Sequence, residues 1–175
     1  MNRVTLFLTN LVVLALFLTS CDSTIEPAEK YMTVNGKKIE LEKAYIYDWG
    51  TNSDITYREY EITFETEGTY PSDYLEIDFF SSSTTRLNEG TYTYKEYYYA
   101  GGNLSNIYVG LNLQYDDKGE AVSGTRFSDW DTDFTGTVTI SKKNDNYMFE
   151  FDLETEYDGQ EYKITGVHND VLKEN

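Results

Sequence analysis

The chain has 175 residues, of which 31 are acidic and 14 basic, giving a formal net charge of −17 at pH 7. A chain this acidic repels phosphate backbones and anionic lipid surfaces, which argues against nucleic acid as a partner. It contains one histidine and one cysteine. These side chains do not suffice for a hydrolytic triad or a histidine-rich zinc site. A glycosidase needs only two carboxylates, and this alternative stays open, but among 31 acidic residues no pair is singled out, so we expect no enzyme.

The first 21 residues have the order of a bacterial lipoprotein signal. Arg3 provides a positive start, Leu11–Leu18 is an apolar block, and Leu18-Thr19-Ser20 directly precedes Cys21. The block is shorter than the about 20 apolar residues that a spanning helix needs. We therefore predict a signal peptide over residues 1–20 and lipidation of Cys21, with acyl chains such as palmitate forming a permanent membrane anchor.

Residues 21–30 follow as the lipidated cysteine and a flexible tether. The segment after Cys21 is polar, contains Pro27 and shows no apolar periodicity. The remaining residues, 31–175, have the length of one domain with a core of its own.

Residues 31–175 alternate apolar and polar side chains with a period of two. The pattern is clearest in five segments, 60–65, 75–79, 107–115, 134–141 and 147–154. One apolar and one polar face is typical of an antiparallel sheet with one side in water. The alternation predicts an all-β domain.

The sequence also predicts two hairpin turns and one irregularity in a strand. Asn35-Gly36 and Asp158-Gly159 suit type I′ hairpins. The apolar phase changes between residues 37 and 48, which predicts a β-bulge near Glu42–Lys43. We expect an antiparallel meander of eight to ten strands, forming a β-sandwich or a calycin-like barrel.

Several segments, taken with the signal, resemble the small β-rich lipoproteins of Bacteroides-type gut bacteria. They are Val34–Gly50, Leu87–Tyr94, Gly136–Ile140, Tyr147–Leu153, Asp158-Gly159 and Ile164–Gly166. The resemblance implies an all-β domain lipid-anchored to the outer membrane, often facing the medium, and it implies no reaction. In such bacteria acidic residues after the cysteine favour surface display, and Asp22-Ser23-Thr24 fits a short O-glycosylation pattern at Ser23.

Acidic residues at every second position suggest a calcium loop. Asp129, Asp131 and Asp133 offer oxygen ligands of the kind that calcium prefers. The segment lacks the EF-hand pattern, because Phe134 stands where glycine is required and Ile140 where the bidentate glutamate belongs. A loop calcium site and a simple Asp-rich turn both stay open, and apart from the lipid we expect no other cofactor.

Tyrosine dominates the aromatic residues, with 17 in the chain. Between residues 92 and 99, alternation places Tyr92, Tyr94 and Tyr98 on one face and Tyr97 and Tyr99 on the other. One set can enter the core, so the second set is exposed or covered by a loop. Exposed aromatic side chains provide rigid contact area for sugar rings or protein partners.

The two tryptophans, Trp49 and Trp130, fall at expected strand ends, where binding surfaces often lie. With Tyr97 and Tyr99 they are our candidate ligand-binding residues. His168 shares the parity of Tyr162 and Ile164 and is expected to be a packed or edge histidine.

These features predict a non-enzymatic, surface-exposed binding or adhesion module for glycan or an envelope protein. The alternatives are a calycin-like barrel that carries a small apolar ligand and a structural subunit of a surface complex. A carrier needs an internal cavity of roughly 300 Å³ or more, whereas a sandwich has a filled core.

Overall fold

The computed structural model describes residues 29–51, 56–96, 99–143 and 146–174, and their regular structure is entirely β-strand. The predicted all-β class is confirmed. Among these residues no helix is long and apolar enough to cross a membrane. The signal peptide, Cys21 and Ser23 lie outside the described residues.

The described residues form twelve strands, against the eight to ten expected, and the extra ones include β2 and β12, which are too short to show alternation. The strands are β1 (Lys30–Val34), β2 (Lys37–Glu40), β3 (Lys43–Gly50), β4 (Arg58–Glu65), β5 (Tyr74–Ser81), β6 (Gly90–Tyr94), β7 (Asn103–Tyr115), β8 (Ala121–Ser128), β9 (Phe134–Lys143), β10 (Asn146–Tyr157), β11 (Gln160–Asp170) and β12 (Lys173–Glu174).

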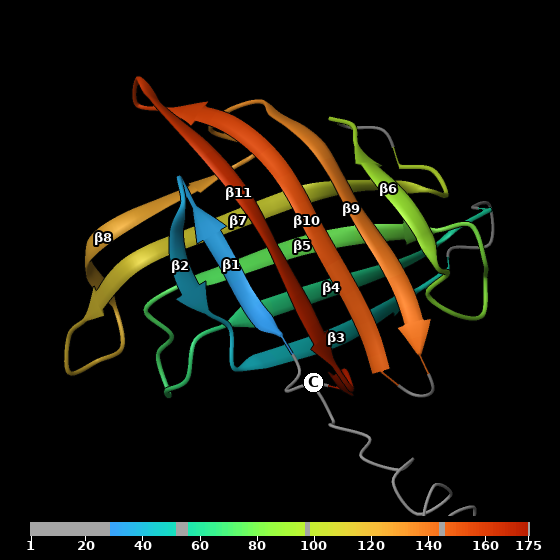
Figure 1. Cartoon of the computed structure of the whole chain (residues 1–175), viewed down its shortest axis with the longest axis horizontal. Coiled ribbons are helices and arrows are strands. Elements are labelled where there is room, and N and C mark those ends of the chain that lie inside the picture. Colours follow the sequence, from blue (N-terminus) through green and yellow to red (C-terminus); the bar gives the residue numbers. More distant parts are fainter. Residues whose placement is uncertain (1–28, 52–55, 97–98, 144–145, 175) are drawn as a thin grey trace, which may run out of the picture.

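All strands belong to one curled sheet. Its order is β12-β3-β4-β5-β7-β6-β9-β10-β11-β1-β2, and β8 pairs with β7 beside this path. Most pairs are antiparallel, as expected, but β6 runs parallel to β7 and β12 parallel to β3. The sheet folds over itself into a half-barrel, so that β9, β10, β11 and β1 cross in front of β3, β4, β5 and β7 (Figure 1).

The two layers enclose a hydrophobic core that is rich in aromatic side chains. The Phe64 ring of β4 lies 5.0 Å from Phe149 and 4.9 Å from Phe151 of β10, measured between ring centroids. The His168 ring of β11 packs 5.2 Å from Phe64 and has no solvent exposure. The expectation of a packed histidine is therefore confirmed. Of the two tyrosine sets, the one with Tyr92 and Tyr94 enters the core.

Both predicted type I′ positions are confirmed. Asn35 and Gly36 have φ angles of 51° and 80°, and Asp158 and Gly159 have 52° and 73°. Positive φ at both central residues matches the twist of the flanking strands. These turns connect β1 to β2 and β10 to β11.

The bulge predicted near Glu42–Lys43 was wrong. The chain leaves β2 at Glu40 and starts β3 at Lys43, and these two strands lie at opposite ends of the sheet path. Leu41 between them is buried, and its N–H donates to the Lys30 carbonyl at 2.8 Å. The apolar phase changes because the chain passes from one layer to the other.

Candidate functional site

The best candidate site lies on the outer face of β4 and β5. Alternation turns Tyr60, Ile62 and Phe64 of β4 into the core and leaves Glu59 and Glu61 on the opposite side. On β5 the same alternation turns Leu75, Ile77 and Phe79 inward and places Glu76 and Asp78 outward. Four carboxylates therefore share one sheet face.

These carboxylates are close neighbours, and no ion pair is formed by any of the four within the described part of the chain. Glu61 stands directly opposite Asp78 in the antiparallel register. Directly opposed side chains have Cβ atoms about 5 Å apart, and like charges in this position destabilise a sheet. Asp78 is only 8% exposed. Burial raises its pKa to about 7, and Glu59, Glu61 and Glu76 add to the rise.

A β-bulge in β7 supplies the hydrogen-bond donor to Asp78. Glu76 pairs with Tyr108 and Asp78 with Ser105, so two residues of β7 face one residue of β5 between these pairs. Asn106, in the bulge, has a φ of 46°, and its Nδ2 donates to Asp78 Oδ2 at 2.6 Å. Bulges often redirect side chains beside functional sites.

A second irregularity, in β3, positions Trp49. Asp48 pairs with Tyr60 and Gly50 with Glu59, which leaves Trp49 as the extra residue. Gly50 follows with a φ of 81°, a conformation that glycine adopts without strain. Trp49 is 58% exposed, and its Nε1 donates to Glu61 Oε2 at 3.2 Å.

These side chains line a hollow of about 480 Å³, which we call the outer groove. Its lining consists of Trp49, Glu59, Glu61, Glu76, Asp78, Asn106 and Tyr108. None of these lining residues is basic. Arg58 is close in sequence, but its guanidinium binds Asp48 Oδ2 at 2.7 Å and the Thr84 carbonyl at 2.9 Å. That ion pair lowers the pKa of Asp48 and holds the Arg58 charge away from the lining of the outer groove.

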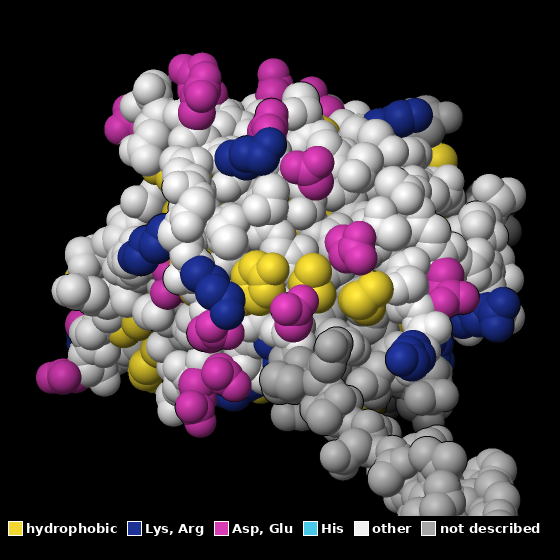
Figure 2. All heavy atoms as spheres, viewed as in Figure 1, with side chains coloured by type: hydrophobic (Ala, Val, Ile, Leu, Met, Phe, Trp, Pro, Cys, Tyr) yellow, Lys and Arg dark blue, Asp and Glu magenta, His cyan; other side chains and the backbone are white. Residues whose placement is uncertain are grey.

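In the layer of β9, β10, β11 and β1, acidic side chains have basic neighbours. Figure 2 shows acidic and basic side chains side by side on the outer face of β9, β10, β11 and β1. Lys30 pairs with Asp170 at 2.5 Å, and Lys163 pairs with Glu154 at 2.5 Å. These two pairs give the outer face of β10 and β11 basic partners that the lining of the outer groove lacks.

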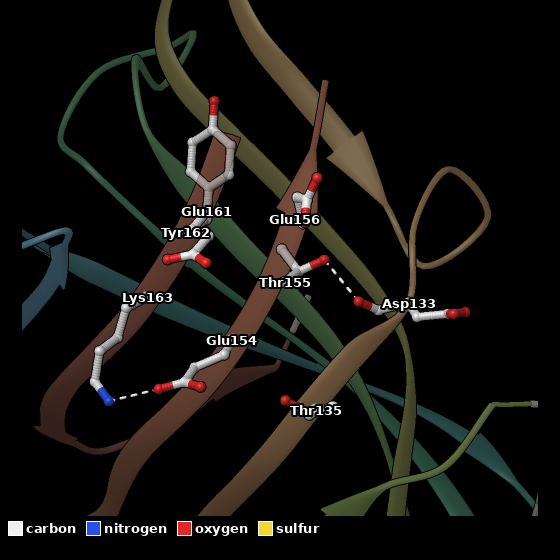
Figure 3. A pocket seen from close by; sticks show the side chains of 8 residues that line it. All are labelled: Asp133, Thr135, Glu154, Thr155, Glu156, Glu161, Tyr162 and Lys163. Carbon is white, nitrogen blue, oxygen red and sulfur yellow. Dashed lines mark hydrogen bonds and ion pairs between the residues drawn. The ribbon is translucent and has the colours of Figure 1, made fainter. Parts of the chain in front are cut away.

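A second hollow, of about 380 Å³, lies between the start of β9 and the β10–β11 pair. Its lining consists of Asp133, Thr135, Glu154, Thr155, Glu156, Glu161, Tyr162 and Lys163. In Figure 3, Lys163 reaches Glu154, and Thr155 donates to the Asp133 carbonyl at 2.7 Å. Tyr162 and Lys163 point to opposite sides of β11, and the charge of Lys163 is matched by that of Glu154.

Three of the four predicted aromatic residues lie in or beside the outer groove. Trp49 lines it, and Trp130, 68% exposed, interacts with the side chain of Tyr108. Tyr99 packs against Phe80, the outward residue that follows Asp78 by two positions on β5, with ring centroids 5.2 Å apart. Tyr97 lies outside the described residues.

The three predicted calcium ligands point to different neighbours. Asp129 is buried and its Oδ2 accepts from Ser105 Oγ at 3.5 Å. Asp131 Oδ2 accepts from both the N–H and the Oγ of Ser128 at 2.9 Å, and Asp133 lines the second hollow. Among the described residues, no group of three or more His, Cys, Asp or Glu side chains is placed to hold a metal ion. Calcium binding stays a prediction.

Sequence reasoning missed the four carboxylates and Asn106. In a chain with 31 acidic residues, no single glutamate stands out, and only the register shows which of them meet. Comparison with protein-family models, curated proteins and solved structures finds no match. The function proposed below therefore rests on the geometry of the outer groove.

Proposed function

We propose that the chain is a non-enzymatic binding module of the bacterial cell envelope, anchored at the outer membrane through lipid on Cys21. Its ligand is a glycan or an envelope protein, held in the outer groove. The observation that carries the proposal is the pair of strand irregularities that aim Trp49 and Asn106 at Glu61 and Asp78.

The carboxylates of the outer groove destabilise the fold, which supports a role in binding. Opposed like charges at Glu61 and Asp78 oppose folding, and so does the burial of Asp78. Lysine or an apolar residue at either position would relieve this cost. Exposed aromatic rings beside fixed polar groups are typical of surfaces that bind ligands. The cluster of buried hydrophobic side chains between the two layers also favours a ligand on the surface over one carried inside.

A glycan array and a set of purified envelope proteins test the proposal. We expect saturable binding that is lost in Trp49→Ala and in Glu61→Gln. Tyr70→Ala is the matched control, because Tyr70 is also exposed but stacks on Tyr115, away from the outer groove. Absence of any saturable ligand, or equal binding by all variants, would contradict the proposal.

The anchor is tested separately. In a bacterial host the wild-type chain is expected to incorporate labelled palmitate and to fractionate with the outer membrane. Cys21→Ser is expected to abolish both, because the thiol is the atom that carries the diacylglycerol. Unchanged labelling of Cys21→Ser would refute the lipid anchor without affecting the outer groove.

A further inference from the structure

The charge of the outer groove selects among ligand classes. Its four carboxylates share one sheet face, on which Glu61 lies directly opposite Asp78. Asp78 is nine-tenths buried, and its only hydrogen-bond donor among the described residues is the amide of Asn106. Neutral hydroxyl groups would leave this repulsion in place. A cation placed over Glu61 and Asp78 would remove it and would form charge-assisted hydrogen bonds.

The spacing of the carboxylates matches an extended peptide. Outward residues two positions apart on a strand are separated by about 6.6 Å, which applies to Glu59 and Glu61 on β4 and to Glu76 and Asp78 on β5. Alternate side chains of an extended peptide have the same repeat. Two basic side chains at positions i and i+2 therefore reach the Glu61–Asp78 pair and Glu76 together.

Aromatic rings border both positions. Trp49 lies next to Glu61, and its ring is 4.5 Å from that of Tyr47, which stands opposite Glu61 on β3. Tyr108, opposite Glu76 on β7, borders the other position. Guanidinium and ammonium groups bind favourably to the faces of such rings, and Arg does so more often than Lys.

We propose that the outer groove binds an extended basic segment of a partner protein, with Arg or Lys side chains at alternate positions. This inference rests on the proposed function, because it assumes that the outer groove is the ligand site. A second copy of this chain does not fit the site, since two chains of net charge −17 repel each other. The partner is therefore a different protein with a locally basic strand or tail.

Fluorescence anisotropy with short labelled peptides tests the inference. One probe carries two arginines at positions i and i+2 between serine and glycine residues. A second has the same composition with adjacent arginines, whose side chains point to opposite sides of an extended chain. A third replaces both arginines by glutamine. We expect the first to bind most tightly, the second about tenfold more weakly, and the third not at all.

Two double variants separate the site from the general acidity of the chain. Glu61→Gln/Asp78→Asn removes two charges from the outer groove, and Glu150→Gln/Asp152→Asn removes two exposed charges from β10. We expect the first variant to bind the alternating peptide at least tenfold more weakly and the second to bind it like the wild type. Near-ultraviolet circular dichroism checks that each variant is folded.

Equal affinity for the two arginine peptides, equal loss in the two double variants, or no binding of either peptide would overturn the inference. The outcome for the proposed function is distinguishable. Suppose that a glycan, or an acidic or neutral protein, binds the wild type and that this binding is lost in Trp49→Ala. The outer groove would then still be the ligand site, but a basic peptide would be excluded as its ligand. Absence of every groove-dependent ligand would overturn both proposals.

Discussion

Replacing Asp78 by asparagine is expected to stabilise the protein at neutral and higher pH while weakening ligand binding. The Asp78 pKa of about 7 lies about three units above its ordinary value of 3.8, because the carboxyl is buried beside other carboxylates. At 1.36 kcal/mol per unit, the ionised form costs the fold about 4 kcal/mol. Asparagine keeps the size of the side chain and an oxygen that accepts from Asn106, so this cost disappears without leaving a cavity.

The pH dependence gives the sign of the effect. Between pH 3.8 and about 7 the folded state holds a proton on Asp78 that the unfolded state releases. The contribution of Asp78 to the free energy of unfolding is therefore fully present below pH 3.8 and is lost as the pH rises through 7. The free-energy difference between Asp78→Asn and the wild type should be near zero at pH 4 and about 4 kcal/mol in favour of the variant at pH 8.

Urea unfolding followed by tryptophan fluorescence measures this difference at both pH values. Asp152→Asn is the control, since Asp152 is exposed on β10 and its removal should change stability little at either pH. A difference between Asp78→Asn and the wild type that is the same at pH 4 and pH 8 would refute the reasoning. So would a variant that is less stable than the wild type at pH 8.

Three further predictions concern other parts of the molecule. Burial lowers the pKa of His168 from 6.5 to about 4. The contribution of His168 to the free energy of unfolding is therefore fully present above pH 6.5 and falls by about 3 kcal/mol as the pH drops to 4. Unfolding curves of His168→Leu should lack this fall. Gly136→Ala should destabilise the fold by several kcal/mol in a thermal melt, because the new Cβ would lie 2.0 Å from the Asp152 carbonyl oxygen at a φ of 115°. If the basic-peptide inference holds, a titration from pH 8 to pH 6 should weaken anisotropy binding as Asp78 takes up its proton, and Asp78→Asn should show no such change.

The parts of the fold that depend on local pattern were predictable from the sequence. Alternation assigned Ile62 and Phe64 to the core, because the period of a strand is set by its own backbone. The turn at Asn35-Gly36 was predictable for the same reason, since the two residues by themselves favour positive φ. Neither inference requires knowledge of which strands are neighbours.

The outer groove could not be predicted in this way, because register and bulges create it. Trp49 was selected from the sequence as an exposed aromatic residue, but its contact with Glu61 follows from an extra residue in β3. Asn106 joins the site only because β7 bulges opposite Ile77. The parallel pairing of β6 with β7 is likewise a contact that alternation does not encode. Each of these features depends on which residue faces which across a strand pair.

Asp78 and His168 have opposite effects on the stability of the fold when the pH falls. As the pH falls from about 7 to 4, protonation of Asp78 raises the free energy of unfolding by about 4 kcal/mol. Over the same range, protonation of His168 in the unfolded state lowers the free energy of unfolding by about 3 kcal/mol. The two windows overlap and have opposite signs, so the contributions of these two groups to stability largely cancel across this range. The two groups lie on opposite sides of the sheet, because Asp78 faces outward from β5 and His168 packs on Phe64 in the core. The outer groove can therefore lose negative charge in acid while the scaffold that positions it stays folded.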